Sequence, residues 1–282
     1  MSANLLALGA IALWATLAAL GVALRHVPPF LLTGLALLVG SLVALPLSNF
    51  QLSNWKVPLP TLALGIYGLF GFHFLLFLAL RHAPPVQANL VNYLWPLLMV
   101  VLAPLLLPGL QLRPVHLVAA LLGFAGAAIV ILGGAETAST NGAWGWSWGY
   151  VPALGSAFIW ASYSLLTKRV AHFPTAAIGG FALVSGLLSL LCHALLEPTI
   201  SLTARDGLLI LVMGLGPMGA AFFLWDMALK RGDARHIGIL SYLTPLASTA
   251  LLIGVSGGRF TWNIALAAAL IIGAALLGTR KN

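Results

Sequence analysis

The chain alternates between long apolar stretches and short polar joints rich in proline, arginine and histidine. A helix that crosses a bilayer needs roughly 20 consecutive apolar residues. Ten stretches of about that length can be separated at the joints, at residues 4–24, 30–47, 59–80, 86–107, 114–132, 150–170, 176–195, 207–229, 236–255 and 262–279. Prolines in the joints end one helix and open the next. The pattern therefore predicts an all-α integral membrane protein with ten transmembrane helices.

Composition and charge change this picture in two ways. The chain is 61% hydrophobic and only 6% charged, whereas a soluble domain carries about 25% charged residues. The net charge of +8 does not indicate a nucleic-acid partner, because the lysines and arginines form no basic stripe. With ten spans, the loops on the side of the termini hold nine of the 13 basic residues. The positive-inside bias then predicts that both termini are cytoplasmic.

The two halves of the sequence resemble each other at nearly constant offsets. Trp14 recurs as Trp160, 146 residues later, and Tyr93 recurs as Tyr242, 149 residues later. A drift of only three residues over half the chain indicates a duplication.

Each half holds five expected spans, an odd number, so the second half must enter the membrane from the opposite side. We therefore expect a first repeat at 1–135, a linker at 136–149 and a second repeat at 150–282. Inverted repeats of this kind are typical of transporters that bind substrate near the membrane midplane, in a central cavity between the halves.

The same motifs resemble a known family. Ten spans in two halves, a tryptophan in the middle of spans one and six, and the sequences NYLWP at 92–96 and SYLTP at 241–245 resemble the drug/metabolite transporter superfamily of EamA-type exporters. The resemblance covers essentially the whole chain, and within the superfamily it is similar to the YddG-type aromatic amino acid exporters of Gram-negative bacteria. It implies a basket of helices around a central cavity, a location in the bacterial inner membrane and export of amino acids or similar metabolites.

Polar and aromatic side chains within the spans are candidates for substrate binding, because polar groups are costly inside a bilayer. Asn89, Asn92 and Tyr93 share one helix face, and Ser241 and Tyr242 repeat part of it in the second half. Such a face could line a cavity for an amphipathic solute, or it could hold helices together through hydrogen bonds.

His73 lies well inside span three, where it could hydrogen-bond a substrate carboxylate, take up a proton or join two helices. Trp95 and Trp225 could line the cavity or face lipid. Asp226 stands four residues before Lys230, which predicts an ion pair along one helix. The candidate substrate-binding residues are Trp14, His73, Phe77, Asn89, Asn92, Tyr93, Trp160, Tyr163, Ser241 and Tyr242.

Two prolines are candidates for gating. Pro96 and Pro245 occupy equivalent positions in spans four and nine, and each frees a carbonyl one turn earlier. We expect them to kink these spans, and the freed carbonyls to face water or substrate.

The motifs of enzymes are missing from the sequence. It contains no phosphate-binding glycine loop, no metalloprotease motif and a single cysteine, Cys192. We therefore expect no cofactor, metal or catalytic residue, and a monomer surrounded by lipid. The predicted function is export of amino acids, aromatic ones favoured within a broad neutral range, by alternating access. The alternatives are export of another small metabolite or drug-like solute, a channel, a receptor and, least favoured, an intramembrane enzyme. Proton-coupled and facilitated transport remain equally open.

Overall fold

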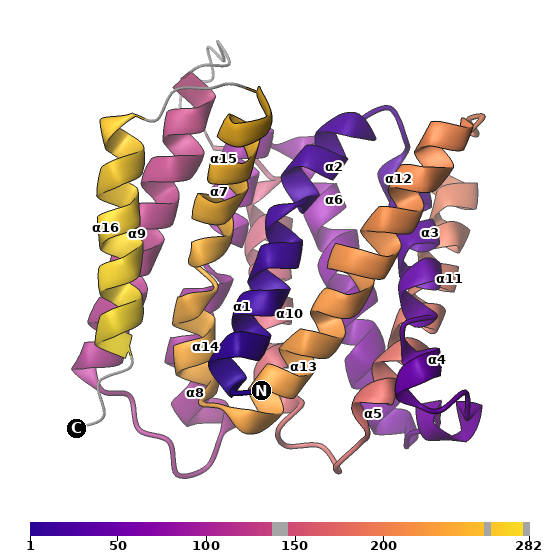
Figure 1. Cartoon of the computed structure of the whole chain (residues 1–282), viewed down its shortest axis with the longest axis horizontal. Coiled ribbons are helices and arrows are strands. Elements are labelled where there is room, and N and C mark those ends of the chain that lie inside the picture. The colour runs from indigo at the N-terminus through magenta and orange to yellow at the C-terminus, as the bar shows by residue number, and fades with distance from the viewer. Residues whose placement is uncertain (137–145, 257–260, 279–282) are drawn as a thin grey trace.

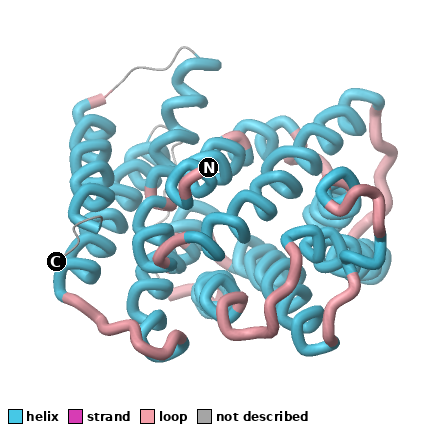
Figure 2. Tube along the Cα trace, turned by 60° about the horizontal axis from the view of Figure 1, so that its bottom comes forward, coloured by secondary structure: helices cyan, strands magenta, loops and turns pink. Residues whose placement is uncertain are grey.

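The computed structural model describes residues 1–136, 146–256 and 261–278, and within them every regular element is a helix. The first half contains α1 (Ala3–Ala15), α2 (Leu17–Ala23), α3 (Pro29–Ser41), α4 (Ala44–Leu47), α5 (Leu59–Ile66), α6 (Phe72–His82), α7 (Pro85–Asn92), α8 (Trp95–Leu106) and α9 (Pro114–Glu136). The second half contains α10 (Tyr150–Leu166), α11 (Ile178–Leu196), α12 (Ala204–Leu215), α13 (Ala221–Arg231), α14 (Ala234–Leu240), α15 (Leu243–Ser256) and α16 (Trp262–Gly278). Short loops join most of these helices (Figure 2).

The described helices are those of a multi-pass membrane protein. Eight continuous segments are long and apolar enough to cross a bilayer, at residues 3–23, 29–47, 59–82, 85–106, 114–133, 175–196, 204–231 and 234–254. Two shorter apolar helices, α10 and α16, occupy the positions expected for spans six and ten. Residues 137–145 of the expected linker lie outside the described residues.

Several spans are interrupted at equivalent places in the two halves. Segments of π-helix lie between α5 and α6, at Tyr67–Gly71, and between α12 and α13, at Gly216–Ala220. The regular helix is also broken between α7 and α8 and again between α14 and α15. Pro96 is the second residue of α8 and Pro245 the third of α15, so both prolines stand just after these breaks, where their missing N–H is not needed.

Two helix pairs join the halves of the chain. α9 runs along α16 on one side of the bundle, and α3 runs along α11 on the other (Figure 1). Small residues allow the close approach, because a Cβ atom added at Gly34 would lie 3.1 Å from the carbonyl oxygen of Gly186. Between these pairs, α1 packs on α13 and α10 packs on α6.

One end of the bundle is organised around Glu197, which follows α11. The Glu197 carboxylate is almost fully buried and accepts hydrogen bonds from the backbone N–H of Phe30 at 3.0 Å and from Arg81 at 3.2 Å. His26 pairs with Asp206 at the same end, at 3.2 Å. We call this the Glu197 end.

The opposite end is organised around Lys230, near the end of α13. Lys230 donates to the carbonyl of Phe173 at 2.9 Å, and Arg231 donates to the carbonyl of Met1 at 3.1 Å. Asp233 and Arg235 form an ion pair at this end. Burial alone would raise the pKa of Asp233, but the hydrogen bonds from Arg235 and the charge of Arg235 outweigh burial and lower this pKa. We call this the Lys230 end.

Helix directions follow from these two ends. α1 begins beside Arg231, at the Lys230 end. α10 begins just after Ser147, which donates a hydrogen bond to the carbonyl of His82 at the end of α6, close to Arg81 and the Glu197 end. α1 and α10 therefore cross the bundle in opposite directions.

Candidate functional site

Aromatic rings from five helices meet in the middle of the bundle. Trp160 of α10 lies 5.8 Å from Trp14 of α1 and 5.4 Å from Phe72 of α6, measured between ring centroids. Trp225 of α13 lies 5.1 Å from Trp14 and 5.6 Å from Trp95 of α8. We define the central aromatic cluster as these rings with two neighbours that also contact Trp160: Trp14, Phe72, Trp95, Trp160, Tyr163, Phe222 and Trp225.

Two of the four indole N–H groups of the cluster have a hydrogen-bond acceptor among the described residues, and two do not. Trp14 donates to the carbonyl of Pro217 at 3.1 Å, within the π segment of span eight, and Trp225 donates to the hydroxyl of Ser164 at 3.1 Å. Among the described residues, neither Trp95 nor Trp160 has a hydrogen-bond acceptor for its N–H. Both rings are more than 90% buried. Since an indole N–H can only donate, two donors in the centre of the bundle remain free for a ligand.

α10 is fixed on both sides of the cluster. The Tyr67 hydroxyl shares a hydrogen bond of 2.8 Å with the Ser162 hydroxyl, and Ser156 donates to the side-chain oxygen of Asn92 at 2.8 Å. The Tyr163 ring packs directly on Gly68. These contacts position Trp160 between the two π segments.

The structure brings together part of the predicted site. Trp14, Trp160 and Tyr163 meet in the cluster. His73 and Phe77 lie at its edge.

The His73 ring is 5.0 Å from Phe72 and 6.1 Å from Phe77, and its Nδ1 donates to the carbonyl of Leu69 at 2.6 Å. His73 therefore already has a helix partner on one nitrogen.

The polar faces of spans four and nine are not brought together in the same way. The side chain of Asn92 joins α7 to α10 through Ser156. Ser241 donates to the carbonyl of Gly238 within its own helix, and the fully buried Tyr242 ring packs on Gly123 of α9. Tyr242 thus lies on the α9 side of the bundle, away from the cluster.

Asn89 and Tyr93 are partly buried on α7 and at its end.

Sequence reasoning did not propose Phe72 and Phe222 for the site, and it left Trp95 and Trp225 open between the cavity and the lipid. For Trp95 and Trp225 the sequence shows an indole but not whether the side chain points into the bundle or toward lipid. A π turn inserts an extra residue into a helix, so the face reached by Phe222 or Trp225 cannot be found by continuing the α-helical period from α12. Pro217, which lies within this π segment, was the available signal.

The expected ion pair in span eight is confirmed. Lys230 Nζ lies 2.6 Å from Asp226 Oδ2, and the Thr175 hydroxyl donates to the same oxygen at 2.7 Å. Asp226 is therefore held at the Lys230 end, apart from the indoles that lack an acceptor.

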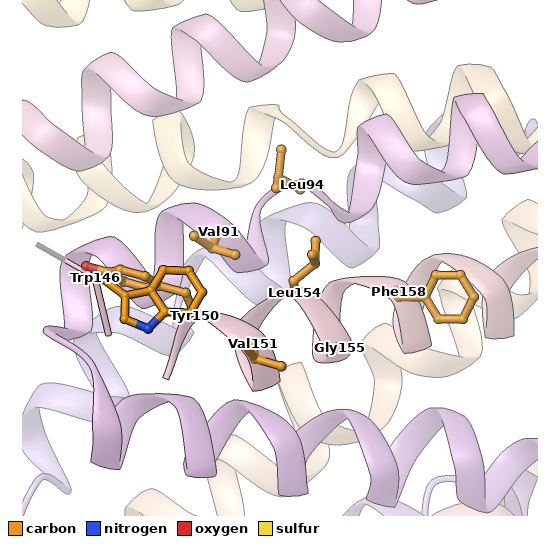
Figure 3. Close-up of a pocket in the computed structure, with 8 residues that line it drawn as sticks. All are labelled: Val91, Leu94, Trp146, Tyr150, Val151, Leu154, Gly155 and Phe158. Atoms are coloured by element: carbon orange, nitrogen blue, oxygen red, sulfur yellow. The ribbon is translucent and has the colours of Figure 1, made fainter. Parts of the chain in front are cut away.

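A separate groove of about 490 Å³ runs along the side of α10. Figure 3 shows side chains of α7, α10 and the break between α7 and α8 around it, with the ring of Trp146 at one end. Val151 and Leu154 on its floor are about half exposed, as expected for a surface that faces lipid. Its lining contains none of the predicted site residues: Val91, Leu94, Trp146, Tyr150, Val151, Leu154, Gly155 and Phe158.

The comparison with known proteins decides the family. The sequence model of the EamA-like transporter family matches residues 1–132 and 147–280. The chain belongs to the EamA-like transporter family. It is therefore a multi-pass membrane transporter and not an enzyme.

Curated members of this family include close relatives. The aromatic amino acid exporter YddG of Ancylobacter novellus is 43% identical over 99% of this chain and 97% of that protein. A probable amino-acid metabolite efflux pump of Salmonella typhimurium is 32% identical over 83% of this chain and 80% of its own length. A solved crystal structure is similar with a TM-score of 0.89 and 41% identity, over 98% of this chain and 95% of the other.

Proposed function

We propose that this EamA-like transporter exports amino acids across the bacterial inner membrane, with aromatic amino acids favoured, by alternating access around the central aromatic cluster. The observation that carries the proposal is the pair of free indole N–H donors, on Trp95 and Trp160, inside a cage of rings. The names of the relatives from Ancylobacter novellus and Salmonella typhimurium support the substrate class.

The chemistry of an aromatic amino acid fits this cage. Its carboxylate needs hydrogen-bond donors, which the indoles of Trp95 and Trp160 provide. Its ammonium group can lie over an indole face, because the ring quadrupole attracts cations. Its side-chain ring can pack against Phe72 or Phe222. Contacts with ring faces discriminate weakly between neutral side chains, so the proposal includes a broad neutral range.

The proposed architecture is ten spans in two inverted five-helix repeats, at 1–135 and 150–282 with a linker at 136–149. The opposite directions of α1 and α10 support the inversion. The π segments support the repeat, since they begin at Tyr67 and Gly216, 149 residues apart. The helix pairs give further support, because equivalent helices of two symmetry-related repeats pack on each other. α3 packs on α11, its equivalent in the second half, and α9 packs on its equivalent α16.

We further propose that the Lys230 end is cytoplasmic, which places both termini inside the cell. Among the described residues, this end carries the larger group of basic side chains: Lys56, Arg113, Lys168, Arg169, Lys230, Arg231 and Arg235. The Glu197 end carries Arg25, Arg81 and Arg205. Cytoplasmic loops are the ones enriched in lysine and arginine.

A transport assay with a panel of solutes tests the proposal. Purified protein in liposomes should take up tryptophan, phenylalanine and tyrosine faster than charged amino acids, with saturation, and empty liposomes should not. Repeating the panel with and without a pH gradient separates proton-coupled from facilitated transport. Saturable flux of unrelated solutes with no flux of any amino acid would refute the proposed substrate class.

A further inference from the structure

Equivalent positions in the two halves differ in burial. Ser164 of α10 is fully buried, whereas its equivalent 146 residues earlier, Ala18, is exposed. Trp225 of α13 is 1% exposed, whereas its equivalent 149 residues earlier, Leu76, is partly exposed. The two halves share one pattern of helices. The difference in burial between equivalent residues therefore reflects how the helices pack at each end of the bundle. At the Lys230 end the facing side chains of α10 and α13 are buried, whereas the equivalent residues of α2 and α6 toward the Glu197 end are exposed or partly exposed.

Two hydrogen bonds span the Lys230 end. Trp225 Nε1 donates to the Ser164 hydroxyl at 3.1 Å, and Lys168 Nζ, just after α10, donates to the carbonyl of Gly232, just after α13, at 2.6 Å. Each bond connects span six to span eight. Together they fasten the last turns of these spans to each other.

The first half has no counterpart of these bonds among its described residues. Val22 stands at the position equivalent to Lys168 and is 65% exposed. α2, which contains Ala18 and Val22, has no buried residue at all. Ala18 and Leu76 also carry no side-chain hydrogen-bonding group, so this pair could not reproduce the contact between Ser164 and Trp225.

We propose that Ser164 and Lys168, with Trp225 and Gly232, form the cytoplasmic gate of the transporter, which is shut in this structure. The assignment rests on the proposed alternating access. In the opposite state the two bonds break, α10 and α13 separate at the Lys230 end, and α2 packs against α6 at the Glu197 end.

Trp225 links the gate to the substrate site. Its ring contacts Trp14, Trp95 and Trp160, while its N–H reaches Ser164. A solute that enters the cluster must displace these rings, and movement of Trp225 weakens its bond to Ser164. Trp225 is thus a positioning residue through which substrate binding loosens the gate.

The test measures the separation of the two gate elements directly. Spin labels on cysteines that replace the exposed Arg169 and Arg231, in a Cys192→Ser background, report the distance between the ends of spans six and eight by electron–electron resonance. Ser164→Ala removes one bond of the gate, and Lys168→Met removes the other. Lys168 lies at the surface, so its substitution leaves the folded bundle intact even if Ser164→Ala does not.

Matched controls exist in the same chain. Ser48→Ala removes a serine hydrogen bond, to the carbonyl of Leu45 in α4, that connects no element of the gate. Lys56→Met removes a positive charge from the Lys230 end, away from the gate.

Each gate variant should increase the ratio of long to short label distances about fivefold, the effect expected from losing one ordinary hydrogen bond. The two control variants should leave this ratio at the wild-type value. An unchanged ratio in both gate variants, or an equal increase in the controls, would overturn the gate. Amino acid flux by the wild type is measured separately: a changed ratio without flux refutes the proposed substrate, whereas flux with an unchanged ratio refutes the gate alone.

Discussion

Trp160 is the residue on which the proposed binding site depends most. It lies at mid-length of α10, in contact with rings from both halves of the chain, and its N–H has no acceptor among the described residues. A buried indole normally finds a hydrogen-bond partner. We propose that its partner in transport is the carboxylate of the solute.

Replacing Trp160 with phenylalanine keeps a ring in the cluster and removes the donor. We expect the solute concentration for half-maximal flux to rise about tenfold, since a hydrogen bond to a charged group contributes about 1.5 kcal/mol or more. The measurement is tryptophan flux in liposomes over a range of concentrations. Trp262→Phe is the control, because Trp262 is 88% exposed, and it should behave like the wild type. Equal effects of the two substitutions would contradict the role of Trp160.

Glu197 is the residue that holds the Glu197 end together. Its carboxylate accepts from the N–H groups of Phe30 and Leu31, from His193 and from Arg81. Glu197→Gln keeps the shape but removes the charge, and hydrogen bonds to charged groups are stronger than neutral ones. We expect a loss of about 2–3 kcal/mol in the free energy of unfolding, measured by thermal unfolding in detergent.

Arg81→Gln is the comparison for Glu197. Arg81 is 43% exposed and makes one of the four contacts, so its loss should cost less than about 1 kcal/mol. If Arg81→Gln lowered the free energy of unfolding as much as Glu197→Gln, the ion pair with Arg81, rather than the hydrogen bonds to the buried carboxylate, would be the main source of stability at this end.

At the level of helices, the π segments and the breaks determine which side chains meet. The π segment at Tyr67–Gly71 places Gly68 against the Tyr163 ring and Tyr67 against Ser162. The equivalent segment at Gly216–Ala220 presents the Pro217 carbonyl to Trp14. Irregular backbone inside a membrane span persists where protein groups satisfy it. The Leu69 carbonyl accepts from His73 of α6, and the Pro217 carbonyl accepts from Trp14 of α1.

Gly68 offers a test of this arrangement. A Cβ atom at this position would overlap the Tyr163 ring, so Gly68→Ala should destabilise the protein by about 1–3 kcal/mol. Gly21→Ala is the control, because a Cβ at Gly21 would meet nothing within 4 Å. That substitution should be neutral or stabilise α2 by up to about 1 kcal/mol. Melting temperatures of the two variants check the difference, and equal temperatures would contradict the close contact.

The sequence predicted the helices better than their contacts. Apolar length and proline-rich joints were sufficient for the eight long spans among the described residues, because lipid requires long helices with satisfied backbones. Trp14 and Trp160 could be paired from the repeat alone. The partners Trp225 and Phe222 could not, since the π turn before them changes the helix face. The repeat makes Tyr242 the equivalent of Tyr93, but it does not indicate that the Tyr242 ring packs on Gly123 of α9.

For the molecule as a whole, the distribution of basic residues predicts the orientation. A green fluorescent protein fused after Asn282 should fluoresce in cells, because it folds in the cytoplasm. Alkaline phosphatase fused at the same point should be inactive, because it needs the oxidising periplasm. The reverse pattern would place the Lys230 end outside the cell and turn the proposed cytoplasmic gate into a periplasmic one.

We propose that aromatic amino acids pass through this molecule. Counterflow in proteoliposomes tests it most directly, since exchange of labelled for unlabelled solute needs no assumption about the energy source. Vesicles that contain purified protein and are loaded with unlabelled tryptophan should transiently accumulate labelled tryptophan, and excess external phenylalanine should suppress the accumulation. Accumulation no greater than in protein-free vesicles, with folded protein confirmed in the membrane, would contradict the claim.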